Sequence, residues 1–260
     1  MKFKLSILSL GFALCVFSAQ ALAHDFWAMA VTPKVNQKLT AVIGYGHDFP
    51  VGEALKDEDM NVRFTPPKVY GEDGEIALEK GSTNSEFVSQ DDLKQGRYVV
   101  TTQTNGLFFT RSVEGFVAKP KNEVKGAKSC VYMVRFGKEA INVGRAKDTG
   151  LAAKAVGQEL EIVPQADPSF IKVGKPFPVK VLFKGQPLGR AEVSAYVAGI
   201  VEHNPALFFQ ARTNPEGIVN IIPLKEGDWL AKVTVEEPYA KKKVCDNTNY
   251  TASYTFKVIK

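Results

Sequence analysis

Short segments rich in valine, isoleucine, threonine and aromatic residues recur along the chain, and most are bounded by glycine, proline, asparagine or aspartate. This composition and spacing are typical of β-strands joined by turns. Several segments alternate apolar and polar residues, as antiparallel strands do when one face packs on a core and the other meets water. We therefore predict an all-β fold with two Ig-like antiparallel β-sandwich domains. The segments span residues 38–46, 62–71, 96–104, 107–117, 176–183, 191–200, 218–224, 228–237 and 250–259.

The middle of the chain alternates less clearly, which predicts a short mixed segment between the two sandwiches. We interpret residues 128–144 as a short helix and residues 151–163 as a connector that runs into a strand. The pair Asp167-Pro168 then favours a turn, which places a domain boundary near residue 165. The predicted division is an N-terminal sandwich over 24–118, a bridging segment over 119–165 and a C-terminal Ig-like sandwich over 166–260.

The first 23 residues have the pattern of a cleaved secretory signal peptide. Two lysines precede an apolar stretch over residues 5–17, which is shorter than the roughly 20 residues that span a bilayer. An A-x-A pattern ends at Ala23, so cleavage there starts the mature chain at His24. A cut after Ala21 fits the same pattern and leaves two residues before the histidine. We expect a soluble protein exported to the periplasm.

The distribution of charge along the chain does not indicate nucleic acid as a partner. The whole chain has 33 basic and 28 acidic residues, a formal net charge of +5. Signal cleavage removes two lysines and no acid, which leaves +3. Basic and acidic residues are spread along the sequence, without the basic stripe and interleaved aromatic residues that nucleic-acid binding requires.

Two cysteines remain after cleavage, Cys130 and Cys245. An exported compartment is oxidising, so an even pair predicts one disulfide. In the chain-entropy model, closing a loop of this length stabilises the fold by about 4 kcal/mol. The alternative, a pair of metal-binding thiolates, lacks the close C-x-x-C spacing of such sites.

Several stretches of the sequence resemble a known family. The C-terminal part reads ADPSFIKVGKPFPVKVLFKGQPLGRAEVSAYVAGI, then TNPEGIVNIIPLKEGDWLAKVTVEEPY and NYTASYTFKV, while AHDFWA stands at the predicted mature start and KEAINVG in the middle. Together they resemble the periplasmic family called domain of unknown function 4198 (DUF4198), over nearly the whole mature chain. Members of that family occur beside energy-coupling-factor nickel and cobalt transporters, so the resemblance implies a part in nickel or cobalt uptake.

His24 is the first candidate metal ligand because of its position. If cleavage follows Ala23, this residue carries a free α-amine as well as its imidazole. The amine nitrogen and Nδ1 of one residue can close a six-membered chelate ring on a metal ion. Nitrogen-rich sites suit Ni²⁺, Co²⁺, Cu²⁺ and Zn²⁺. Both groups must be neutral to bind, so affinity should fall as the medium becomes acidic.

The other two histidines and two aspartates complete the candidate site. The tripeptide His-Asp-Phe at the mature start returns at His47, in a loop between glycine and proline, and His203 lies in a second loop-like stretch. Asp25 and Asp48 are candidate oxygen ligands or partners that orient an imidazole. The alternative is that the histidines are ordinary surface residues and the aspartates cap turns.

These observations lead to one main functional hypothesis and two alternatives. The sequence contains no nucleophile elbow, zinc-protease, nucleotide-binding or calcium-loop motif, and we do not expect an enzyme. The main hypothesis is a periplasmic protein that captures Ni²⁺ or Co²⁺ and presents it to a membrane uptake transporter. The alternatives are an interaction module that binds an exported protein or a glycan, and a copper protein with a histidine brace.

Overall fold

The structure, a computed structural model, describes residues 24–31, 33–199 and 208–260, without the side chains of residues 59 and 61. The predicted signal peptide and His203 lie outside these residues. In the described part the chain is all-β, with mostly antiparallel strand pairing and one short α-helix, α1 (Asp57–Arg63), so the predicted fold class is confirmed. No helix in this part combines the length and apolar character needed to cross a membrane. Short 3-10 turns lie at Lys121–Glu123, Leu151–Ala153 and Pro168–Phe170.

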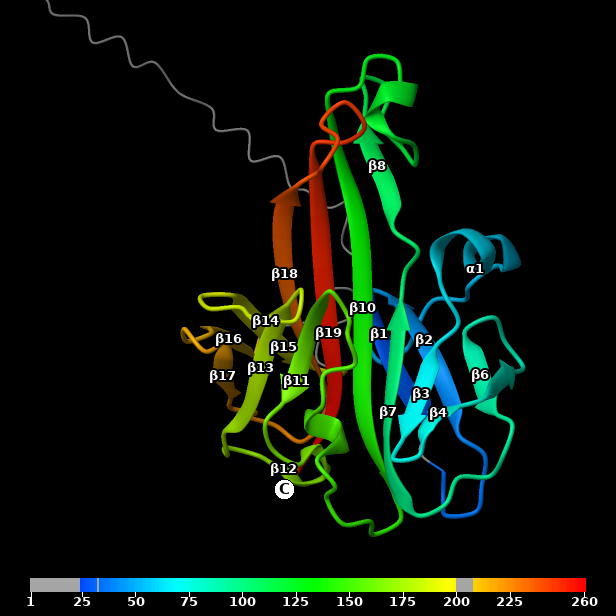
Figure 1. Cartoon of the computed structure of the whole chain (residues 1–260), viewed down its shortest axis with the longest axis vertical. Coiled ribbons are helices and arrows are strands. Elements are labelled where there is room, and N and C mark those ends of the chain that lie inside the picture. Colours follow the sequence, from blue (N-terminus) through cyan, green and yellow to red (C-terminus); the bar gives the residue numbers. More distant parts are fainter. Residues whose placement is uncertain (1–23, 32, 200–207) are drawn as a thin grey trace, which may run out of the picture.

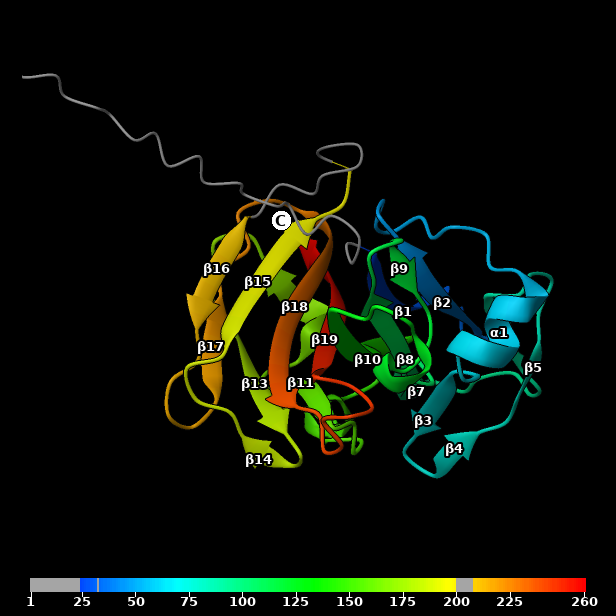
Figure 2. The same ribbon diagram turned by 90° about the horizontal axis from the view of Figure 1, so that it is seen from above.

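One large sheet of eleven described strands extends through both halves of the molecule, as Figures 1 and 2 show. Its main path follows the order β16-β15-β18-β19-β10-β7-β3-β4, and β8, β9 and β12 branch from it. The two halves join where β10 and β19 pair in parallel. The strands are β3 (Lys68–Gly71), β4 (Gly74–Ile76), β7 (Gly96–Gln103), β8 (Leu107–Arg111), β9 (Phe116–Val117), β10 (Ser129–Val143), β12 (Ile171–Lys172), β15 (Glu192–Val197), β16 (Phe209–Arg212), β18 (Gly227–Pro238) and β19 (Asn247–Ile259).

Two four-stranded sheets pack against this large sheet, one in each half, and so form the two sandwiches. The C-terminal core is the larger and contains Trp229, whose side chain is fully buried. A smaller apolar cluster around Trp27 and Tyr196 joins the two halves. The N-terminal sheet contains β1 (Asp25–Val31), β2 (Thr40–Gly46), β5 (Leu78–Lys80) and β6 (Glu86–Ser89), and the C-terminal sheet contains β11 (Leu160–Pro164), β13 (Phe177–Phe183), β14 (Gln186–Pro187) and β17 (Ile218–Ile221).

The prediction of a short helix over 128–144 is wrong, because this segment is the long central strand β10. β10 is covered on both faces, so the regular alternation that marks a half-buried strand is absent from its sequence. Three charged residues, Arg135, Lys138 and Glu139, lie in its central part. Lys138 is fully buried and its Nζ lies 2.6 Å from Glu161 Oε1, so even this charged position belongs to the interior.

The predicted boundaries at 118 and 165 stay a prediction. Each of the three predicted segments supplies a strand to the middle of the large sheet: β7 from the first, β10 from the second and β19 from the third. The connector assigned to residues 151–163 does run into a strand, β11. The two sandwiches therefore share a sheet, whatever boundary is drawn between them.

The first strand, β1, lies directly on the large sheet. At Gly137 in β10, an added Cβ would come within 2.5 Å of the Ala28 nitrogen, so only glycine allows this approach. Ser253 and Thr255 of β19 donate hydroxyl hydrogen bonds to the carbonyl oxygens of Phe26, at 2.6 Å, and Ala28, at 2.9 Å. Close packing and side-chain hydrogen bonds therefore fix the beginning of the predicted mature chain against the body of the protein.

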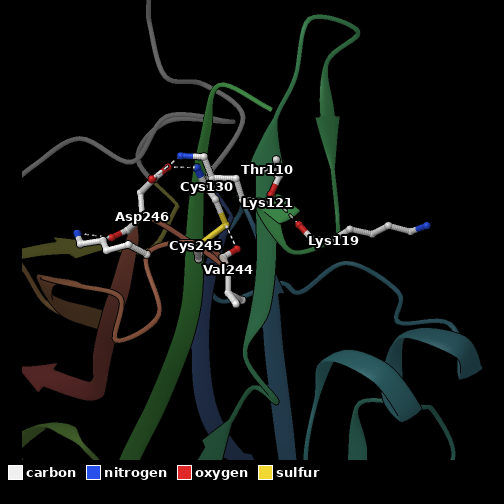
Figure 3. Close-up of a disulfide and its surroundings, with 8 residues drawn as sticks. Thr110, Lys119, Lys121, Cys130, Val244, Cys245 and Asp246 are labelled. Atoms are coloured by element: carbon white, nitrogen blue, oxygen red, sulfur yellow. Dashed lines mark hydrogen bonds and ion pairs between the residues drawn. A yellow bond between two sulfur atoms is a disulfide. The ribbon is translucent and has the colours of Figure 1, made fainter. Parts of the chain in front are cut away.

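The predicted disulfide between Cys130 and Cys245 is confirmed. It joins the start of β10 to the loop between β18 and β19, at one end of the longest axis of the molecule (Figures 1 and 3). Asp246 supports the same connection, because its carboxylate accepts hydrogen bonds from Lys121 Nζ at 2.6 Å and from the Cys130 amide at 2.8 Å. We call residues 107–130 and 239–246, which this disulfide holds together, the tip.

Candidate metal centre

The strand register explains why His24 and His47 face each other. β1 and β2 are antiparallel, and Asp25 pairs with Gly46 at the end of the ladder. One step further along the same register places His24 opposite His47. Their ring centroids are 4.1 Å apart with the planes tilted by 38°. The repeated tripeptide of the sequence thus brings its two histidines together at one end of a strand pair.

The orientation of His24 is set by its neighbours. Its carbonyl oxygen accepts a hydrogen bond from Arg135 Nη1, a side chain of β10. Its imidazole stacks on Tyr45, with centroids 4.7 Å apart and an angle of 14° between the planes. Backbone and ring are therefore both held, although about a third of the side chain remains accessible to solvent.

Glu53 is the third member of the site, and the sequence analysis missed it. Its Oε1 lies 3.1 Å from His24 Nε2, and its backbone N–H donates to the Tyr45 carbonyl at 2.8 Å. Gly46 makes room for it, since a Cβ there would come within 2.9 Å of Glu53 Cγ. The turn residues Pro50 and Gly52 after His47 were the available signal that the chain folds back here.

Potential ligand atoms of His24, His47 and Glu53 all lie within 4.8 Å of one another. In the part of the chain that the structure describes, these three residues form the group of histidine and carboxylate side chains that could hold a metal ion. The set combines imidazole nitrogen with carboxylate oxygen, which suits divalent transition metals.

Burial lowers the pKa of the His24 imidazole. The neighbouring His47 and the Arg135 guanidinium lower this pKa further, while the carboxylate of Glu53 opposes the shift. A lower pKa favours the neutral imidazole, which is the form that binds a metal ion.

The structure does not bring the two aspartates into this group. Asp25 follows His24 and, as expected for neighbouring residues in a strand, its side chain takes the opposite direction. It is buried, where its carboxylate accepts hydrogen bonds from Lys232 Nζ, at 2.6 Å, and from the Tyr196 hydroxyl. Asp48 is exposed, and its carbonyl oxygen accepts from the Val51 N–H in the turn that leads towards Glu53. Asp25 thus ties the first strand to the C-terminal half.

Comparison with known proteins shows the family. The model of the family described as domain of unknown function, DUF4198, matches residues 21–237, which is most of the chain. The chain belongs to the DUF4198 family. No curated protein matches this DUF4198 chain.

Two solved structures are similar to this DUF4198 protein over most of its length. One is the D0-D1 domain of intimin, with 15% identity, 90% of this chain and 97% of that chain covered, and a TM-score of 0.22. The other comprises the three N-terminal domains of the highly immunogenic outer capsid protein (Hoc) of bacteriophage RB49, with 7% identity, coverage of 91% and 100%, and a TM-score of 0.23.

Proposed function

We propose that this protein is a periplasmic metal-binding protein that captures Ni²⁺ or Co²⁺ for a membrane uptake transporter and is not an enzyme. The observation that supports the proposal is the convergence of His24, His47 and Glu53 at the anchored start of β1. The site lies at the surface, with the side chains of His24 and Glu53 35% and 50% exposed. An open site of this kind suits a cargo ion that must enter and leave.

The proposed ligands are three nitrogens. Signal cleavage after Ala23 exposes the α-amine of His24, which chelates the ion together with Nδ1 of the same residue, and His47 supplies the third nitrogen. Nε2 of His24 then remains free to donate its hydrogen to Glu53, at the observed 3.1 Å. Such a carboxylate partner fixes the imidazole tautomer and orientation of a ligating histidine. Glu53 is therefore assigned to positioning.

The anchored chain start favours metal capture. A ligand on a freely moving terminus loses conformational entropy when it binds, which weakens affinity. Here the carbonyl of His24 is held by Arg135, its ring by Tyr45 and the next residue, Asp25, by Lys232. Much of the ordering needed for chelation is therefore already present in the folded protein.

Calorimetric titration with Ni²⁺, Co²⁺, Cu²⁺ and Zn²⁺ tests the proposal, on protein whose mature N-terminus has been verified by mass spectrometry. Glu53→Gln should reduce affinity by about 10–100-fold, the effect typical of a lost partner of a ligating histidine. His24→Ala and His47→Ala should cost more. Asp48→Asn, a change beside His47 but outside the group, should have no effect. Equal Ni²⁺ affinities of the unmodified protein and His24→Ala would overturn the proposal.

The role of the α-amine has its own test. An extra glycine before His24 converts the amine to an amide and leaves both imidazoles and Glu53 in place. Since β1 begins only at Asp25, the fold should not change. A large loss of affinity supports the chelate, whereas unchanged affinity excludes the α-amine as a ligand. Uptake of nickel by cells that carry His24→Ala in place of the natural protein tests delivery to a transporter.

A further inference from the structure

The tip concentrates the positive charge of the protein. Residues 107–130 and 239–246 contain eight basic and three acidic residues, a formal net charge of +5. The chain from His24 onward has a net charge of +3, so everything outside the tip sums to −2. The basic residues are Arg111, Lys119, Lys121, Lys125, Lys128, Lys241, Lys242 and Lys243. The charge is therefore collected at one end of an otherwise slightly acidic molecule.

The tip is an ordered part of the fold. Its two segments are joined by the disulfide, by the Lys121–Asp246 ion pair at 2.6 Å and by a backbone hydrogen bond from Lys121 N–H to the Val244 carbonyl. Thr110 Oγ1 donates to the Lys119 carbonyl at 2.6 Å and so closes the β8–β9 hairpin. Figure 3 shows these connections, with the Lys119 side chain extending away from the disulfide. The charges are thus carried on a fixed surface.

Apolar side chains are exposed among these charges. Val113 and Phe116, in the β8–β9 hairpin, are 68% and 54% exposed. Phe116 pairs in register with Arg111, and the Lys119, Lys125 and Lys128 side chains are exposed nearby in the sequence. Exposed apolar and aromatic residues bordered by lysines are the composition of surfaces that lie in a lipid headgroup region.

We propose that the tip docks onto an anionic lipid surface. The exposed lysines of both segments belong to the end of the molecule that projects along its longest axis (Figure 1). Electrostatic attraction brings the lysines to the headgroups, and Phe116 and Val113 enter the boundary with the acyl chains. This docking uses none of the metal-site residues and stands independently of metal capture.

Co-sedimentation with vesicles tests this docking. Vesicles of phosphatidylcholine alone are compared with vesicles that also contain phosphatidylglycerol. Each lysine near an anionic surface contributes about fivefold in affinity, so Lys241→Gln, Lys242→Gln and Lys243→Gln together should weaken binding about a hundredfold. Phe116→Ser should weaken binding without changing its salt dependence. Binding of the unmodified protein should fall as salt is raised.

A matched control removes three exposed lysines from the opposite end, Lys172, Lys175 and Lys225, near the β12–β19 pair (Figure 1). This variant has the same net charge as the tip variant and should bind almost as well as the unmodified protein. Equal losses in both variants, binding indifferent to phosphatidylglycerol, or no vesicle binding at all would overturn the proposal. The measurement is made in EDTA and repeated with His24→Ala, so failure of metal binding cannot produce any of these results.

Discussion

Gly137→Ala is the most direct test of how β1 is placed on the large sheet. The new Cβ would lie 2.5 Å from the Ala28 nitrogen and 2.7 Å from the Trp27 carbonyl carbon, both backbone atoms. Ordinary contact begins near 3.4 Å, so β1 must retreat by about 0.9 Å. That retreat stretches three hydrogen bonds that hold β1: Ser253 to Phe26 O at 2.6 Å, Thr255 to Ala28 O at 2.9 Å, and Ala30 N–H to Glu139 at 2.6 Å.

The expected cost follows from these contacts. Three weakened hydrogen bonds at about 1 kcal/mol each and an overpacking penalty of about 1–3 kcal/mol give a loss of about 4–6 kcal/mol in the free energy of unfolding. In a chain of this size the melting temperature should fall by about 10 °C or more. Urea unfolding followed by circular dichroism measures the first quantity, and calorimetry the second.

The same substitution should have little effect on metal affinity. His47 and Glu53 belong to the strand and loop that pair with β1, so the group moves with His24 as one unit. We expect a change of only a few-fold in Ni²⁺ affinity. Ser253→Ala, which removes one of the three hydrogen bonds without adding bulk, should cost about 1 kcal/mol. A Gly137→Ala protein as stable as the unmodified one would refute the close approach of β1 to β10.

Three further predictions concern the interior and the tip. Lys138→Met should destabilise the protein by about 3–5 kcal/mol in urea unfolding, because it leaves the buried Glu161 carboxylate without its lysine partner. Adding Glu161→Gln to this variant should restore most of the lost stability. Burial raises the pKa of Glu139 to about 8. Between pH 4.5 and 8 the unfolded chain has lost this proton while the folded protein keeps it, so stability should decline as the pH rises through this range. Glu139→Gln should remove this contribution to the pH dependence of the urea midpoint. Replacing Cys130 and Cys245 by serine, which removes a link across 115 residues, should cost about 2–5 kcal/mol and speed hydrogen exchange first in the tip.

The sequence predicts the fold class well because most strands leave one face in solvent. Alternation is visible in such strands, and β13 is an example, with buried residues at every second position of its first half. β10 has no such signal, because both of its faces are covered. Phe136 and Lys138 are buried on one face, and Gly137 lies against β1 on the other. The parallel pairing of β10 with β19 cannot be predicted from local sequence patterns either, because it joins segments more than a hundred residues apart. The prediction of a helix over 128–144 is wrong because β10 lacks the alternation of a half-buried strand.

The candidate site could be predicted in part. His24 and His47 carry a repeated local motif, and the register of an ordinary antiparallel pair is enough to bring them together. Glu53 reaches the site through a loop whose path depends on the turn after His47, and no spacing rule states that path. Asp25 was predicted as a candidate beside its neighbour His24, yet strand geometry directs its carboxylate to Lys232, in the other half.

The metal site and the tip are connected by one strand. Arg135, which holds the carbonyl of His24, and Cys130, which anchors the tip, both belong to β10 and are five residues apart, about 17 Å along the strand. β10 is paired on both sides in this region, with β8 and β19, so it has little freedom to bend. If the tip rests on a lipid surface, the same rigid strand fixes the height of His24 above that surface. A captured ion would then be held within reach of a membrane transporter without any hinge motion, which links the two proposals while leaving each open to its own test.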